Sequence, residues 1–263
     1  MKGYILNDDK RLNSTMLYLI KQNVLLYDSF LGKQDLDFIL FGYNGLNEHL
    51  ETNNVKNYCK LTEDYFKNIP ASLKIFTVKI DLTLKKLHEK YGFYYEALME
   101  DPDFISKNAW LSGEGVVGEL LKKRCYQLSN SKIAIIGYGH CGKAIAELLS
   151  GFHCDLYIVD VDFKAQEQVL KDGFTLIDKH DLPLILPDCV IVTATQSLDQ
   201  DTICHLPKET YYFDIASAPY GYDHRLNLKH DFLLKNLPAS YGYKSAGILV
   251  GKWLERRVQD AQR

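Results

Sequence analysis

Three glycines in the middle of the chain have the spacing of a dinucleotide-binding turn. Residues 133–136 form an apolar, β-prone run, residues 137–142 read GYGHCG, and a helical pattern follows. In such a turn Gly137 permits the tight bend, Gly139 lets the backbone approach a pyrophosphate, and Gly142 lets the helix pack close to its strand. The free N–H groups at the start of the helix would then bind the phosphates.

A carboxylate follows the next apolar run. Residues 156–159 end in Asp160, eighteen residues after Gly142, where a carboxylate would accept hydrogen bonds from the adenosine ribose. The alternative is an aspartate that only ends a strand. Asp162 adds a second negative charge, which Lys164 offsets in part. Two carboxylates would repel a 2′-phosphate, so the sequence favours NAD over NADP and leaves NADP open.

Two later segments also follow predicted strands, at 193–195 and 216–217. The carboxyl ends of parallel strands face the cofactor crevice, so their hydroxyl and backbone groups are expected to bind the nicotinamide ribose and amide; ordinary strand-end turns are the alternative. The predicted cofactor-binding residues are Gly137, Tyr138, Gly139, His140, Cys141, Gly142, Asp160, Thr193, Ala194, Thr195, Ala216 and Ser217.

Three residues are candidates for catalysis. Glu114 lies among glycines, where a carboxylate in a dry cleft would have a raised pKa and accept a proton; a helix N-terminal Glu is the alternative. Lys244 would bind an anionic substrate or act as a general acid at a carbonyl, or is a solvated charge. His140 would donate to the pyrophosphate or reach the nicotinamide, or faces solvent. Cys141, at a helix start, has either a lowered thiol pKa or a packing role.

Five further residues are candidates for substrate binding. Arg11 is the residue expected to recognise a carboxylate, because its guanidinium binds such groups in a bidentate manner. Asn44 lies in a turn-rich segment after a predicted strand. Ser112 neighbours Glu114, Tyr243 would line the same pocket as Lys244, and Ser245 is the expected N-cap of the last helix.

Alternating strands and helices predict an α/β protein with parallel sheets. The predicted strands are residues 2–6, 24–27, 36–41, 72–78, 133–136, 156–159, 174–177, 188–195, 211–215 and 232–234. The predicted helices, besides the one after Gly142, are residues 12–21, 61–67, 108–123, 163–170 and 244–257.

The same pattern predicts two domains. Residues 1–107 form an α/β substrate domain and residues 108–244 a dinucleotide-binding domain, with residues 245–263 as a helix on the first domain. The helix at 108–123 contains three glycines, each of which costs about 1 kcal/mol in a helix interior. Close approach between two domains would compensate that cost.

Composition excludes several classes of protein. The chain has 263 residues, of which 46% are hydrophobic and 25% charged, as in a globular protein. A net charge of −3 without a basic run gives no reason to expect nucleic-acid or membrane binding. The six cysteines are scattered without a CxxC pair, which argues against zinc and for a reduced compartment. No apolar stretch approaches membrane-spanning length, so we expect a cytoplasmic protein.

Four segments, in order, resemble the A subunit of bacterial dipicolinate synthase. They are SGEG (112–115), IGYGHCG (136–142), FDIASAPYG (213–221) and LPASYGYKSAG (237–247), where that family has VEG, GLGRTG, LDLASRPGG and LPG…PKTAG. Residues 7–11 stand where the family has GGDAR. More broadly, the chain is similar to the NAD-binding half of D-2-hydroxyacid dehydrogenases. His140 and Ala218 stand where the family has Arg, which changes groups that would pair with carboxylate or phosphate.

The resemblance implies two Rossmann-like domains joined by an interdomain helix, with a C-terminal helix returning to the N-terminal domain. It also implies a nicotinamide-dependent redox step on a heterocyclic dicarboxylate. We therefore expect an NAD(P)-dependent oxidoreductase that moves hydride to or from a small carboxylate-bearing substrate between the domains. A 2-oxo-acid or imine reductase is one alternative, and a non-catalytic dinucleotide sensor or partner subunit is another. A homodimer is expected by analogy only.

Overall fold

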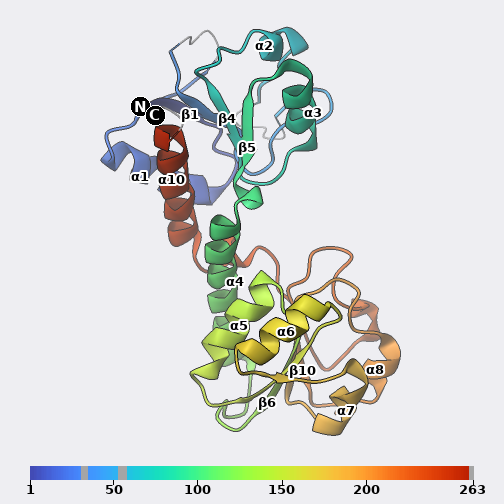
Figure 1. The fold of residues 1–263 in the computed structure, drawn as a ribbon. Helices are drawn as coiled ribbons and strands as arrows, with labels where there is room; N and C mark the ends of the chain where they lie inside the picture. The colour runs from blue at the N-terminus through green and yellow to red at the C-terminus, as the bar shows by residue number, and fades with distance from the viewer. Residues whose placement is uncertain (31–34, 53–57, 261–263) are drawn as a thin grey trace. The chain divides into compact units, whose positions relative to one another are not determined.

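The computed structural model describes residues 1–30, 35–52 and 58–260. Contacts divide the chain into two compact units (Figure 1). Unit 1 comprises Met1–Asn108 and Gly242–Arg263, and unit 2 comprises Ala109–Tyr241. Each unit contains one parallel sheet, and the C-terminal helix packs within unit 1, which confirms the predicted fold class. Residues 261–263, which we assigned to that helix, lie outside the described residues.

Unit 1 has a five-stranded parallel sheet with the order β2-β1-β3-β4-β5. Its strands are β1 (Lys2–Ile5), β2 (Leu25–Tyr27), β3 (Phe38–Leu40), β4 (Lys74–Thr77) and β5 (Tyr94–Ala97). Its helices are α1 (Lys10–Lys21), α2 (Glu63–Lys67), α3 (Leu82–Tyr91), the start of α4 (Pro102–Lys123) and α10 (Tyr243–Asp260). The strand order reverses direction between β1 and β3, so the loops after these two strands meet at the switch point.

Helix α10 is part of the core of unit 1. It lies beside α1 (Figure 1), and its Val250, Trp253 and Leu254 are buried in one cluster with Leu12 and Leu19 of that helix. The two helices lie at close range, since the Thr15 hydroxyl donates to the carbonyl of Gly247 at 2.8 Å. The last helix therefore completes the first domain across more than two hundred residues of sequence.

Two helical glycines give opposite expectations for substitution. A Cβ on Gly247 would lie 2.0 Å from the Arg11 carbonyl oxygen of α1, whereas a Cβ on Gly118 of α4 would meet no atom within 4 Å. Gly247→Ala should lower the free energy of unfolding by about 2 kcal/mol through overpacking. Gly118→Ala should raise it by about 1 kcal/mol through helix propensity. Calorimetric unfolding of both variants tests the pair, and a stable Gly247→Ala protein would contradict the close helix contact.

Unit 2 has a six-stranded parallel sheet with the order β11-β10-β9-β6-β7-β8. Its strands are β6 (Lys132–Ile136), β7 (Asp155–Val159), β8 (Thr175–Leu176), β9 (Cys189–Val192), β10 (Tyr211–Asp214) and β11 (His230–Leu233). Its helices, besides the rest of α4, are α5 (His140–Ser150), α6 (Phe163–Lys171), α7 (Leu182–Ile185), α8 (Gln200–Cys204) and α9 (Leu237–Ser240). This order places the switch point between β6 and β9, where a dinucleotide crosses such a sheet.

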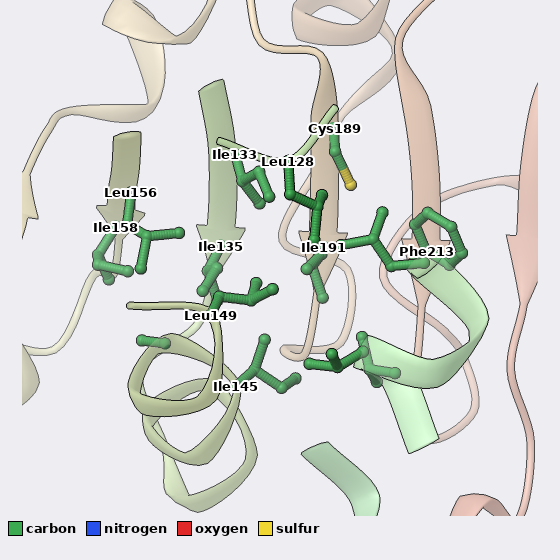
Figure 2. Packing of buried hydrophobic residues seen from close by; sticks show 14 of the residues in the cluster. Leu128, Ile133, Ile135, Ile145, Leu149, Leu156, Ile158, Cys189, Ile191 and Phe213 are labelled. Atoms are coloured by element: carbon green, nitrogen blue, oxygen red, sulfur yellow. The ribbon is translucent and has the colours of Figure 1, made fainter. Parts of the chain in front are cut away.

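The glycine turn is anchored by the core beneath it. Figure 2 shows Ile145 and Leu149 of α5 pointing toward Ile135 and Ile191 of the sheet. All four side chains are fully buried. Helix α5 is therefore fixed against β6 and β9 by apolar packing, with its first turn at the carboxyl edge of the sheet.

Several predicted boundaries are wrong. The strand expected at 188–195 ends at Val192, because Thr193 turns its hydroxyl back onto backbone carbonyls. Helix α4 begins at Pro102, not at 108, because the Asp101 carboxylate accepts the N–H of Asp103 at 2.9 Å and caps the helix. Five elements of the structure were not predicted from the sequence, namely α3, α7, α8, α9 and β5. Within the described residues no helix is long and apolar enough to cross a membrane.

Candidate functional site

The three glycines of the turn occupy three different environments. Gly137 has φ +98°, a backbone conformation that side chains disfavour. A Cβ on Gly142 would lie 1.9 Å from the Gly137 carbonyl oxygen, so only glycine lets α5 start this close to β6. A Cβ on Gly139 would meet no atom of the described residues within 4 Å, its chain neighbours aside. The space at Gly139 is thus open on the side where a pyrophosphate would approach the backbone.

The start of α5 offers donors that no side chain occupies. Gly139 is the N-cap residue and supplies no capping side chain. The first N–H groups of the helix therefore keep their hydrogen-bonding capacity, and the helix dipole adds a partial positive charge. Together with the open space at Gly139, this arrangement fits the phosphates of a dinucleotide.

Asp160 joins the glycine turn to the end of β7. Its carboxylate accepts the N–H of Tyr138 at 2.6 Å and the N–H of Asp162 at 2.8 Å. Each oxygen keeps a further lone pair, so the carboxylate can still accept from ribose hydroxyls. A cavity of about 620 Å³ adjoins it and is lined by the end of β7, by Gln166 of α6 and by the turn after β8. That volume lies in the range of small-molecule sites.

The segment after β9 supports the turn directly. The Thr193 hydroxyl lies 3.1 Å from the carbonyl oxygens of both Ile136 and Gly137 and donates toward them. Ala194 packs against Gly137, whereas Thr195 is exposed. Thr193 therefore holds the glycine turn with its side chain, a use that differs from the expected contact with nicotinamide ribose.

The segment after β10 is fixed by the Asp214 carboxylate at the end of that strand. Ala216 is buried and its N–H donates to the Asp214 carboxylate at 2.8 Å, while Ser217 is exposed. Because β10 pairs with β9, these two residues lie on the same sheet edge as Thr193. The described structure thus gathers the predicted cofactor residues of unit 2 along one edge.

Cys141 and His140 have different surroundings. Burial raises the pKa of the Cys141 thiol, and a hydrogen bond with Ser112 of α4 only partly opposes that rise. The alternative of a lowered thiol pKa is therefore wrong, since burial outweighs the helix N-terminus. His140 is exposed at the open end of the turn. Ser112 lies against the glycine turn through its contact with Cys141.

Glu114 is exposed in the interior of α4. The alternative of a helix N-terminal Glu is wrong, because the helix begins twelve residues earlier at Pro102. The buried carboxylate of this helix is Glu119, which accepts a hydrogen bond from the Tyr241 hydroxyl. Glu119 was not among the predicted residues, although it lies three residues after the apolar Val116 and so shares its buried helix face.

In unit 1, Arg11 lies in the first turn of α1 and Asn44 in the loop after β3, both at the switch point. Asp8 joins these loops, since its carboxylate accepts the N–H of Asn44 at 2.7 Å. Asp9 binds the Arg11 guanidinium with both oxygens, at 2.7 and 2.8 Å, and the guanidinium lies 3.6 Å from the Tyr43 ring centre. Burial acts to raise the pKa of Asp9, but the hydrogen bonds from Arg11 outweigh it and lower the pKa.

Tyr243, Lys244 and Ser245 form the exposed first turn of α10. Ser245 is not the N-cap as predicted, because the helix begins at Tyr243. Lys10 of α1 lies 5.1 Å from the Tyr243 ring, so the starts of α1 and α10 are adjacent. The first turns of two helices and two lysines therefore share this edge of unit 1, which gives it a positive potential.

A further cluster in unit 2 was missed altogether. Asp214 ends β10 with no exposed surface, and His224 lies between it and Asp231 of β11. A carboxylate directly after an apolar strand was the available signal, as it was for Asp160. Nothing in the spacing of His224 pointed to Asp214.

Comparisons with known proteins agree with this geometry. Residues 97–210 match the family described as D-isomer specific 2-hydroxyacid dehydrogenase, NAD binding domain. The A subunit of dipicolinate synthase from Bacillus subtilis (strain 168) is 21% identical over 208 residues, which cover 77% of this chain and 70% of that protein. The matched family segment includes the glycine turn, Asp160 and the residues after β9.

Solved structures share the fold over the whole chain. The A chain of dipicolinate synthase from Bacillus subtilis superposes with a TM-score of 0.87 at 19% identity, covering 100% of this chain and 97% of that chain. An NAD-complexed D-isomer specific 2-hydroxyacid dehydrogenase from Lactobacillus delbrueckii ssp. bulgaricus superposes with a TM-score of 0.62 at 13% identity. The match covers 100% of this chain and 97% of that chain. The predicted resemblance is confirmed: residues 97–210 are similar to the NAD-binding domain of D-isomer specific 2-hydroxyacid dehydrogenases, and the chain resembles the A subunit of dipicolinate synthase in fold.

Proposed function

We propose that this protein is an oxidoreductase that binds NAD(H) in residues 108–244 and exchanges hydride with a small carboxylate-bearing substrate. The observation that carries the proposal is the glycine turn, with open space at Gly139 and an uncapped α5 behind it. Bound nicotinamide would supply the hydride chemistry. The protein would supply binding, orientation and exclusion of water.

The residues of unit 2 would divide the work of holding the cofactor. The N–H groups of His140 and Cys141 would bind the pyrophosphate, and His140 would add a ring donor at the open end of the turn. Asp160 would accept from the adenosine ribose. Ala216 and Ser217 would bind the nicotinamide amide, and Thr193 would keep the turn in shape.

Residues 1–107 would bind the substrate. Lys10 and Lys244 are cations at adjacent helix starts, and we propose that they and Arg11 attract its carboxylates, with Asn44, Tyr243 and Ser245 as further polar groups of unit 1. Because Asp9 already pairs with Arg11, Lys244 is the better candidate for direct contact. Lys244 is the exposed group of unit 1 that would exchange the proton accompanying hydride transfer, and Glu114 is the exposed candidate of unit 2 for the same role.

A non-catalytic partner subunit is the second candidate. Ala218 stands where the resembling family has Arg, so this chain lacks a guanidinium at the end of the β10 segment. The relative of 21% identity is itself named as one subunit of a synthase, which supports a partner chain. A third candidate is a 2-oxo-acid or imine reductase, which the likeness in fold to a 2-hydroxyacid dehydrogenase supports.

All six cysteines are free, which supports a cytoplasmic location.

The decisive experiment combines binding with turnover. NADH and NADPH binding is measured by fluorescence titration. Turnover is followed as reduction of NAD(P)+ with dihydrodipicolinate as the hydride donor, and as oxidation of NAD(P)H with 2-oxo acids and cyclic imines as hydride acceptors. Turnover of any of these supports an enzyme and identifies the substrate class. Tight NADH binding without turnover of any of them supports the partner subunit, and absence of dinucleotide binding refutes both proposals.

Asp160 should set the preference of the protein for NADH over NADPH. We expect the wild-type protein to bind NADH at least about tenfold more tightly than NADPH, because the carboxylate accepts from ribose hydroxyls and repels a 2′-phosphate. Asp160→Ala should weaken NADH binding about tenfold and reduce the preference. Asp201→Ala, an exposed carboxylate on α8, is the control and should change neither affinity. An unchanged preference in Asp160→Ala would refute this role.

A further inference from the structure

The strand β10 ends in a fully buried carboxylate that organises the loop after it. Asp214 has no exposed surface. One of its oxygens accepts the N–H of Ala216 at 2.8 Å, and the other accepts the N–H of Gly221 at 2.7 Å. Both ends of the 216–221 loop are therefore tied to one side chain. A buried carboxylate needs a compensating charge as well as these donors, because desolvation of the ion is costly.

His224 supplies that charge. Its Nε2 lies 2.9 Å from the second oxygen of Asp214, and its Nδ1 lies 3.0 Å from both oxygens of Asp231 on β11. A neutral imidazole has one N–H, whereas an imidazolium has two and can donate to both carboxylates. The geometry therefore fits the protonated ring, held between the two strands that flank the loop.

The other groups around His224 reinforce this state. The Tyr222 hydroxyl donates to Asp231 at 2.5 Å, and the rings of Tyr220 and Tyr222 pack against the imidazole. Asp223, the preceding residue, pairs with Arg225. Burial acts to lower the pKa of His224, but the hydrogen bonds to Asp214 and Asp231 outweigh it and raise the pKa.

We propose that His224 is a positioning residue for the cofactor: by bridging Asp214 and Asp231 it fixes the 216–221 loop, which presents Ala216 and Ser217 to the nicotinamide end of the dinucleotide. The inference rests on the proposed function, because it assigns the loop after β10 to cofactor binding. The control of the 216–221 loop by the charge of His224 does not depend on that function, because it follows from hydrogen bonds within unit 2.

The sign of the pH effect follows from the raised pKa. A group whose pKa is higher in the folded protein stabilises it fully below the unfolded value, about 6.5 for histidine. That stabilisation is lost as the pH rises through the higher folded value. Above it, the imidazole has only one N–H and can no longer donate to both Asp214 and Asp231, so the loop loosens. Order in residues 216–221 and affinity for NADH should therefore both fall as the pH rises above about 6.5.

Two readouts on the full chain test the proposal. The first is the hydrogen-exchange protection of the Ala216 and Gly221 amides in the free protein, expressed as protection factors between pH 5.5 and 8.5. The second is the dissociation constant of NADH over the same range. His224→Gln keeps a neutral donor, and Asp231→Asn removes one of the charges that raise the pKa. His205→Gln, an exposed histidine of the same unit, is the control.

In the wild-type protein and in His205→Gln, we expect protection and NADH affinity to fall together by about tenfold with rising pH, as expected for loss of a charged hydrogen bond. His224→Gln should remove this pH dependence, and Asp231→Asn should move its midpoint to lower pH. A wild-type midpoint that persists in His224→Gln overturns the proposal. If protection responds as expected but neither NADH nor NADPH binds the wild-type protein, the proposed function fails and the cofactor role of His224 with it.

Discussion

Gly139→Val is expected to abolish dinucleotide binding without unfolding the protein. Gly139 has φ −71° and ψ −167°, a conformation open to any residue, and a side chain there meets no protein atom within 4 Å. The fold should therefore change by no more than about 1 kcal/mol, the typical size of an N-cap effect. The new methyl groups would occupy the space that a pyrophosphate needs, so NADH affinity should fall at least about a hundredfold, or about 2.7 kcal/mol. Fluorescence titration with NADH measures the loss.

Gly151→Val is the matched control for this variant. Gly151 caps the other end of α5 with φ −68°, and the nearest atom to a Cβ there is 3.8 Å away. It should cost a similar amount of stability and leave NADH affinity unchanged. Equal binding by Gly139→Val and wild-type protein would show that the pyrophosphate does not lie against this turn, and the proposed cofactor site would then be wrong.

The glycine turn was predictable because its determinants are local. Gly137 must bend, Gly142 must let a helix approach, and both needs arise within six residues of sequence. Asp160 was predictable because parallel strands end at one edge, so a carboxylate after the next strand comes near the turn. The two parallel sheets were predictable because strands and helices alternate along the chain.

The charge pairings were not predictable, because they depend on tertiary packing. Arg11 was expected to be available to a substrate, but Asp9 lies within bidentate reach once α1 begins at Lys10. His224 meets Asp214 only because a loop folds back under β10. Glu114 and Glu119 lie on one glycine-rich helix, and which of them is buried depends on where Tyr241 packs. In each case the residue type was visible and its partner was not.

Asp101→Ala is expected to lower the stability of unit 1 by about 3 kcal/mol. This carboxylate is only 7% exposed and has two tasks. It caps α4 through the N–H of Asp103, and it accepts the indole N–H of Trp253 at 2.7 Å. The guanidinium groups of Arg256 and Arg257 of α10 also donate to its Oδ2, at 3.1 and 3.0 Å. Its removal leaves a buried indole donor without a partner and an uncapped helix, which calorimetric unfolding would measure.

Two matched variants separate these effects. Asp101→Asn keeps one oxygen for the helix cap and should lose about half as much stability, because the oxygen that accepts from Trp253 is replaced by an NH2 donor. Asp103→Ala, an exposed neighbour that pairs with Lys107, should change stability by less than about 0.5 kcal/mol. If Asp101→Ala is as stable as Asp103→Ala, then Asp101 does not tie α10 to α4 within unit 1.

The same carboxylate should make unit 1 sensitive to acid. Burial acts to raise the pKa of Asp101, but the hydrogen bonds from Trp253, Phe104 and Asp103 and the charge of Arg257 outweigh it and lower the pKa. A group whose pKa is lower in the folded protein contributes its full stability above the unfolded value, about 3.9 for aspartate, and loses it as the pH falls through the lower folded value. The wild-type protein should therefore lose stability more steeply below about pH 4 than Asp101→Asn, so that the two unfolding curves converge in acid. Parallel curves down to the acid transition would show that the carboxylate charge contributes nothing to holding α10 in the first domain.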